Sequence, residues 1–260
     1  MNVHKAAAGV LMALSVSAQP GLGAEYSSAK DLVMAVRAQR VQQGFEARLQ
    51  AVTTDSMGHR SVPVRFSVIG QFEADRLRLV FRAIAPSEVR DRTLAAELAS
   101  DGSIIAVERL PANPPAAKAA DPFGTLFGSE LVIWDLLAPW WYWPAQAVEG
   151  SATFSGQKCQ VVRSRPRAAR APIAEAISCV RPDALLSLST ELLNSRGEVV
   201  RTILLIQTAR RESGALTPRR FTVIAAKGSV TQVEVYSADE HHPIDATTFA
   251  MLDSSVTRGR

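Results

Sequence analysis

The side chains best suited to chemistry lie near the C-terminus, in the segment DEHHPID at residues 239–245. Imidazole and carboxylate groups bind metal ions, and a histidine beside a carboxylate can activate a serine nucleophile. His241 and His242 are adjacent, however, so they are poorly placed to converge on one ion, and no second cluster completes a ligand set. No sequence feature marks a nucleophile for a triad with Asp245. We therefore predict a polar turn in this segment.

The patterns of common enzyme and metal sites are also missing from the sequence. The chain has no G-x-S-x-G elbow, no H-E-x-x-H, no C-x-x-C and no phosphate-binding loop. We predict no metal site, no cofactor and no enzymatic activity. A hydrolase that uses His241 or His242 is the least favoured alternative.

The two cysteines, Cys159 and Cys179, form the other reactive pair. They flank a loop rich in Arg, Pro and Ala and are equidistant from its centre at residue 169. In a simple antiparallel hairpin they would face each other, and an even count in an exported chain is typical of a disulfide. We predict a Cys159–Cys179 disulfide that contributes about 3 kcal/mol. Two unpaired thiols in the core are the alternative.

Export is predicted from the first residues, MNVHKAAAGVLMALSVSAQPGLGA. Lys5 precedes an uncharged apolar run, and small residues end at the cleavage candidates Ala18 and Ala24, an order typical of a signal peptide. The run is too short to span a membrane, which takes about 20 apolar residues. No cysteine near the cleavage candidates offers a lipid-attachment site. We predict a signal peptide at 1–24 and one soluble periplasmic domain at 25–260.

The positive charge of the chain is spread out rather than concentrated. The net charge is +4, and the densest basic run is RSRPRAAR at 163–170. Nucleic-acid binding requires a concentrated basic face. We therefore predict that this run is a solvated hairpin tip and that nucleic acid is not a partner.

The hydrophobic pattern changes from a helical to a strand period early in the chain. Leu32 and Val36 fall at helical spacing behind the candidate N-cap Ser28, which predicts a helix at 28–42. Apolar and polar residues then alternate in about eleven short segments separated by turn residues. The Pro- and Ala-rich residues 111–122 are predicted to be a loop. The predicted fold is mainly β (α+β), a curled antiparallel sheet that forms an open or closed barrel.

An aromatic cluster lies in GSELVIWDLLAPWWYWP, residues 128–144. It holds all four tryptophans together with one tyrosine: Trp134, Trp140, Trp141, Tyr142 and Trp143. Aromatic side chains bury large areas, so the cluster could form permanent core. It could also line a ligand cavity, or form an exposed patch for a membrane or a protein partner. A curled sheet often encloses an apolar cavity, so we expect the protein to bind something apolar.

The first part of this stretch resembles a known signature. GSELVIWDL at 128–136 resembles the G-S-D-F-x-Y-E-D-L pattern of the outer-membrane lipoprotein-sorting family, whose relatives are the LolA and LolB lipoprotein carriers. Gly128, Ser129, Asp135 and Leu136 match, and Glu130 replaces an Asp. The family's aromatic positions within the signature are here leucine and isoleucine. Three further blocks, at 81–94, 179–205 and 228–253, are similar to family segments and follow in the same order.

The resemblance implies an unclosed antiparallel barrel whose short helices cover the concave face as a lid. It also implies that the concave face receives acyl chains. The side chains that we expect to line this cavity or its lid are Phe66, Phe81, Leu131, Trp134, Leu137, Trp140, Trp141, Tyr142 and Trp143.

The same resemblance suggests the partners. They are acyl chains or lipoproteins, an inner-membrane transporter and, transiently, a membrane surface. Because the chain lacks a lipid-attachment site, it is more similar to the soluble carrier LolA than to the lipid-anchored LolB. The alternative function is a periplasmic interaction module that acts as the partner of an exporter or as a sensor of envelope stress.

Overall fold

The computed structural model describes residues 25–39, 44–73, 76–110, 116–167 and 172–256. The predicted signal peptide at 1–24 lies outside the described residues. Among the described residues, no helix is long and apolar enough to cross a membrane.

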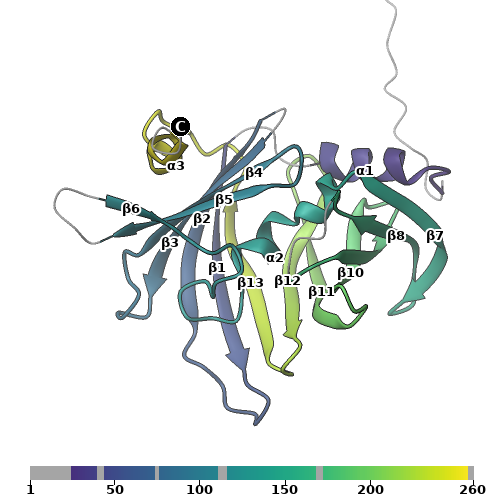
Figure 1. The fold of residues 1–260 in the computed structure, drawn as a ribbon, viewed down its shortest axis with the longest axis horizontal. Coiled ribbons are helices and arrows are strands. Elements are labelled where there is room, and N and C mark those ends of the chain that lie inside the picture. The colour runs from purple at the N-terminus through teal and green to yellow at the C-terminus, as the bar shows by residue number, and fades with distance from the viewer. Residues whose placement is uncertain (1–24, 40–43, 74–75, 111–115, 168–171, 257–260) are drawn as a thin grey trace, which may run out of the picture.

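Thirteen strands form one antiparallel sheet in the order β6-β5-β4-β3-β2-β1-β13-β12-β11-β10-β9-β8-β7 (Figure 1). No pairing among the described residues joins β6 to β7, so the sheet is unclosed. The first strands are β1 (Phe45–Thr54), β2 (Val64–Phe72), β3 (Arg76–Ala85), β4 (Thr93–Ala99), β5 (Ile104–Leu110) and β6 (Ala116–Ala119). The later strands are β7 (Ala145–Phe154), β8 (Gln157–Arg165), β9 (Glu175–Arg181), β10 (Leu186–Leu193), β11 (Val199–Arg210), β12 (Leu216–Ala225) and β13 (Val230–Asp239).

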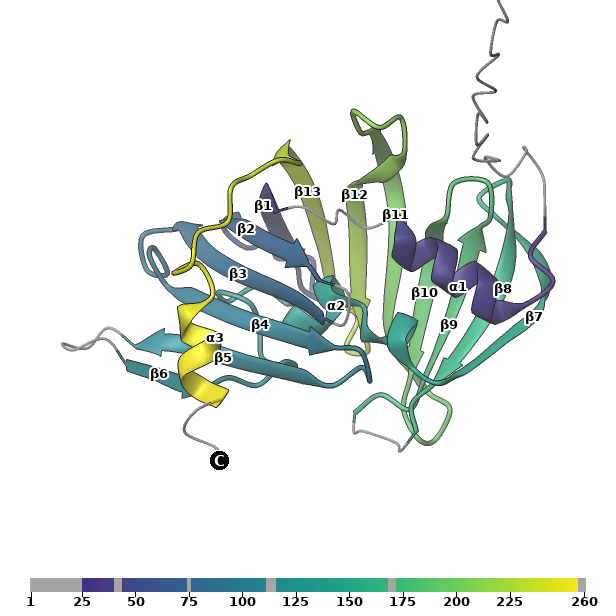
Figure 2. The ribbon, with the colours of Figure 1, turned by 90° about the horizontal axis from the view of Figure 1, so that it is seen from above.

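The two halves of the chain meet at β1, which pairs with β2 on one side and with β13 on the other. The chain builds the sheet outward from β1 to β6, crosses the concave side, and returns from β7 to β13 (Figure 2). The crossing segment contains α2 (Ile133–Leu137) and the short 3-10 helix η1 (Pro139–Tyr142). We call residues 120–144 the inserted segment. It fills part of the hollow that the curled sheet surrounds.

The predicted unclosed, mainly β fold is confirmed, but the predicted count of about eleven strands is too low. Strand β6 lies inside the stretch 111–122 that was expected to be a loop, and it pairs Ala119 with Val107 of β5. Alanine is depleted in strands, so the local pattern carries no strand signal. The free edge of β5 supplies the hydrogen-bonding partners that order these residues.

The predicted N-terminal helix is present as α1 (Ala29–Ala38). The Ser28 hydroxyl accepts a hydrogen bond from the Asp31 N–H at 3.2 Å, as its predicted role as N-cap requires. Leu32 and Val33 are buried against the inserted segment, so α1 covers the hollow on the β7–β11 side (Figure 2).

The C-terminal helix α3 (Ala250–Val256) lies on the opposite, convex face of the sheet (Figures 1 and 2). Phe249 and Leu252 pack there against Ala95 and Val107. Strand β4 is therefore covered on both faces, which explains why its TLAAELA sequence is nearly all apolar instead of alternating.

Two arginines of the basic run at 163–170 are paired with acidic side chains. Arg163 pairs with Glu149 and Glu175, and Arg165 also pairs with Glu175. These pairs lie across neighbouring strands, so the arginines brace the sheet instead of forming a free basic face.

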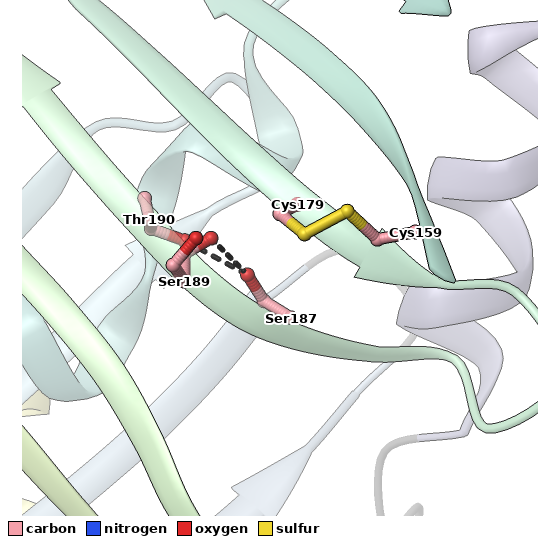
Figure 3. Close-up of a disulfide and its surroundings, with 5 residues drawn as sticks. All are labelled: Cys159, Cys179, Ser187, Ser189 and Thr190. Carbon is pink, nitrogen blue, oxygen red and sulfur yellow. Dashed lines mark hydrogen bonds between the residues drawn. A yellow bond between two sulfur atoms is a disulfide. The ribbon is translucent and has the colours of Figure 1, made fainter. Parts of the chain in front are cut away.

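The predicted disulfide between Cys159 and Cys179 is present, with 5.3 Å between the Cα atoms (Figure 3). The predicted register is wrong by two residues, because Cys179 pairs with Val161 in the β8–β9 ladder. A long hairpin has no tight turn to set its register. The equal distance of the two cysteines from residue 169 therefore does not fix which residues pair. Cys159 and Val161 point to the same face, which leaves Cys159 as the diagonal neighbour of Cys179.

The paired substitution Cys159→Ser and Cys179→Ser is expected to lower the free energy of unfolding by about 3 kcal/mol. The bridge limits the unfolded chain by closing a loop over a sequence separation of 20 residues. Urea unfolding of oxidised wild type and variant measures the difference. A reducing agent should give wild type the same loss and leave the variant unchanged. Equal stabilities of wild type and variant would contradict the prediction.

Candidate functional site

The inserted segment is held by tight turns at both ends of its helical part. Gly128 has φ of +83°, which a residue with a side chain rarely adopts, and the Ser129 hydroxyl donates to the Leu126 carbonyl at 2.7 Å. Ala138 adopts the left-handed conformation at φ +49°, so α2 ends there and η1 begins at Pro139. Most side chains of α2 and η1 are buried.

A buried ion pair fastens the segment to β11. Asp135 Oδ1 accepts from Arg201 Nε at 2.8 Å, and Asp135 Oδ2 accepts from Arg201 Nη2 at 2.5 Å. The Asp135 side chain is fully buried and that of Arg201 is 13% exposed. Arg201 also donates to the Glu130 carbonyl at 2.9 Å, and the Val132 N–H donates to Asp135. The ion pair and its hydrogen bonds therefore connect both α2 and the turn before it to β11.

Burial and these contacts shift the pKa of the Asp135 carboxyl group in opposite directions. Burial raises the pKa of the Asp135 carboxyl above its usual range, because the charged form is removed from water. The Arg201 guanidinium and the Val132 N–H lower this pKa and offset part of the shift.

The four tryptophans are all buried, with exposed fractions of 3–7%. Trp134 is the centre of the group, since its ring lies 5.0 Å from that of Phe123, 5.8 Å from Trp140 and 5.7 Å from Trp143. Tyr142 is half-buried under Arg37 of α1, 4.1 Å above its ring. This burial rules out an exposed patch for the tryptophans and leaves core and cavity wall as their roles.

A cavity of about 450 Å³ lies between the inserted segment, α1 and the sheet. Its β1–β3 wall is formed by Phe45, Ala47, Phe72 and Leu77, and its β11–β13 wall by Ile203, Leu205, Phe221 and Val235. Further apolar lining comes from the helices and from the start of β10: Val36, Leu136, Trp140, Trp141, Leu185 and Leu186. A cavity of this size and apolar lining fits one small hydrophobic ligand.

Polar groups contribute to two parts of the cavity wall. On one side lie Glu46, Arg211 and Glu240, where Arg211 pairs with Glu240 at 2.7 Å and donates to the Gln39 carbonyl of the α1 C-cap at 2.8 Å. On the other side β10 contributes the hydroxyl groups of Ser187 and Thr190. Because Arg211 is paired with Glu240 and bonded to Gln39, these charged residues form the rim of the cavity beside α1.

The predicted site residues separate into two groups in the structure. Trp140 and Trp141 line the cavity. The other seven candidates lie in the packed core around it or, for Tyr142, at its edge: Phe66, Phe81, Leu131, Trp134, Leu137, Tyr142 and Trp143. Of the signature residues, Asp135 and Leu136 reach the cavity, while Gly128, Ser129 and Glu130 shape the turn before α2. Most of the predicted lid side chains therefore hold the segment in place.

Arg201, the ionic partner of Asp135, is not among the predicted site residues. Its signal is a lone arginine in the apolar strand VVRTILLI, where a buried charge demands a partner. The strand pattern gives no means of pairing it with a residue 66 positions away.

The histidine segment forms the predicted polar turn. Asp245 accepts from the backbone and hydroxyl of Thr247 and from the Thr248 hydroxyl, and the Thr247 hydroxyl is the largest cause of its lowered pKa. His242 lies 3.8 Å from Glu46 and His241 lies 3.9 Å from Glu212. Over the described parts of the chain, no three His, Cys, Asp or Glu side chains gather closely enough to hold a metal ion.

Solved structures of three proteins are similar to this chain in overall fold. A domain described as an outer membrane lipoprotein-sorting protein, from Vibrio parahaemolyticus, has a TM-score of 0.77 at 12% identity, over 88% of this chain and 97% of its own. A LolA superfamily protein from Nitrosomonas europaea has a TM-score of 0.69 at 12% identity, over 85% of this chain and 97% of its own. This chain has the LolA-like fold.

The third structure is a DUF1329 family protein from Desulfovibrio piger. It has a TM-score of 0.76 at 14% identity, over 85% of this chain and 95% of its own. No family model matches the chain, and no curated protein sequence matches it either. The likeness therefore concerns the fold alone.

Proposed function

We propose that the protein is an exported, non-enzymatic carrier that holds a lipid acyl chain in the cavity under α1 and the inserted segment. The observation that carries this proposal is the apolar cavity of about 450 Å³ on the concave face. The LolA-like fold supports it, since one structural neighbour is described as a lipoprotein-sorting protein. Lipoproteins or other acylated molecules of the bacterial periplasm are the proposed cargo, and a membrane transporter is the proposed donor.

The size of the cavity favours one chain at a time. A methylene group is about as large as a water molecule, whose share of liquid water is roughly 30 Å³, so the cavity holds about fifteen such groups. Each methylene removed from water contributes about 0.8 kcal/mol. A single long acyl chain is therefore both accommodated and held without covalent chemistry.

A brominated fatty acid is expected to quench the tryptophan fluorescence of the protein in a saturable way. All four tryptophans lie in the inserted segment, and Trp140 and Trp141 line the cavity, so a brominated chain in the cavity lies within reach of the indoles. Titration at constant protein concentration gives the dissociation constant. Absence of quenching, together with lipid-free protein in native mass spectrometry, would contradict the carrier and favour the interaction module.

Filling the cavity tests its location. Ala47→Phe places a ring in the cavity and should weaken binding at least tenfold, because each displaced methylene costs about 0.8 kcal/mol. The matched control is Arg48→Phe, on the opposite face of β1, where the side chain is 55% exposed. It should bind like wild type. Equal losses in both variants would place the ligand elsewhere.

A further inference from the structure

The β10 side of the cavity carries a chain of hydroxyl groups whose hydrogens are all in use. The Ser187 hydroxyl donates to the Ser189 carbonyl at 2.8 Å and lies 3.0 Å from the Thr190 hydroxyl (Figure 3). The Thr190 hydroxyl in turn lies 2.9 Å from that of Ser178. Thr190 and Ser178 are 2% and 0% exposed, while Ser187 is half-buried and lines the cavity.

The direction of these hydrogen bonds follows from the first of them. A carbonyl can only accept, so the single Ser187 hydrogen is committed to Ser189. Thr190 must then donate to Ser187, and Ser178 must donate to Thr190. Each hydroxyl oxygen keeps at least one free lone pair, and none keeps a free hydrogen. Toward the cavity the group can therefore only accept.

A β-bulge creates this arrangement. Residues three apart in a regular strand point to opposite faces. The β9–β10 register shifts between Ser187 and Ser189, which turns Ser187 to the same face as Thr190. Cys179 pairs with Ser189 in the same ladder, so the disulfide strand holds the carbonyl that orients Ser187 (Figure 3).

We propose that the polar group of the bound amphiphile is a hydrogen-bond donor, a hydroxyl or an amide N–H, that is recognised by Ser187. This inference rests on the proposed function, because it presupposes an acyl chain in the cavity. An ester carbonyl or a carboxylate at this position would face oxygen lone pairs and gain no hydrogen bond. A glycerol hydroxyl and the N–H of an N-acyl amide share the required chemistry.

The test compares four ligands of equal chain length by displacement of a brominated fatty acid from the protein. A monoacylglycerol supplies a hydroxyl and a primary fatty amide supplies an N–H, whereas the methyl ester and the free fatty acid at neutral pH supply neither. We expect at least one donor ligand to bind roughly fivefold more tightly than the methyl ester, the gain of one net hydrogen bond. The ligand that shows the gain identifies the source.

Ser187→Ala should bind the donor ligands no more tightly than the methyl ester. The matched control is Ser164→Ala, which removes a fully buried hydroxyl that bonds Gln146 at 2.6 Å and lies outside the cavity lining. It should preserve the preference. Equal binding of all four ligands by wild type, or a preference that survives in Ser187→Ala, would overturn the inference while leaving the carrier intact. Binding of none would overturn both.

Discussion

Asp135→Ala is expected to destabilise the protein by about 3–5 kcal/mol, because it leaves Arg201 buried without its counter-charge. The Arg201 side chain is only 13% exposed, and the lost carboxylate also accepts the Val132 N–H at the start of α2. The expected loss is read from urea unfolding. Since all tryptophans lie in the inserted segment, their fluorescence shows whether this segment separates from the sheet before global unfolding.

The paired replacement Asp135→Leu with Arg201→Met provides the rescue. It removes both charges and should restore most of the stability, since a hydrophobic pair of similar volume can replace a buried ion pair. Glu149→Ala is the surface control: it breaks a pair with Arg163 whose carboxylate is 39% exposed, and it should cost no more than about 1 kcal/mol. A loss for Asp135→Ala as small as that of Glu149→Ala would mean that the pair does not hold the segment.

Trp134→Ala is expected to cost about 3–5 kcal/mol, because the indole is the hub of a packed aromatic group and its removal leaves a large void. Trp134 is 7% exposed and contacts the rings of Phe123, Trp140 and Trp143. Stability is measured by circular dichroism during urea unfolding, because the substitution itself alters the fluorescence. Lipid binding should also weaken, since Trp140 would lose the support of its neighbour.

Trp140→Phe is the matched control for this prediction. The Trp140 indole N–H is buried and has no acceptor among the described residues. A buried unpaired donor costs about 1–3 kcal/mol, so phenylalanine should offset much of its lost volume by removing that donor. A large loss for Trp140→Phe beside a small loss for Trp134→Ala would reverse the assigned roles of the two residues.

Much of the fold was predictable because local chemistry expresses it. Ser28 caps α1 through its hydroxyl, and the alternation in the strands marks which faces are buried. The cysteine count anticipated the disulfide. The strand β6 was not predictable, because alanines pair there only through the edge that β5 offers.

The candidate site was predictable only in outline. The aromatic stretch indicated a region of importance, and two of its residues, Trp140 and Trp141, line the cavity. The sequence alone could not distinguish these two residues from Trp134 and Trp143. The latter pair are also buried, but their rings contact each other. The β10 hydroxyl chain was not predictable, since a bulge that reorients Ser187 leaves no local pattern.

The strand periods, the helix cap, the presence of a disulfide and the concentration of aromatics follow from the amino-acid sequence alone, because each depends on residues that are neighbours or on a simple count. Three further features come from the packed chain: which tryptophans face the cavity, the pairing of Arg201 with Asp135, and the contact of Ser187 with Thr190 on one wall. These contacts depend on long-range strand register and on the curl of the sheet. Both arise from packing the whole chain together, and no short stretch of it encodes them.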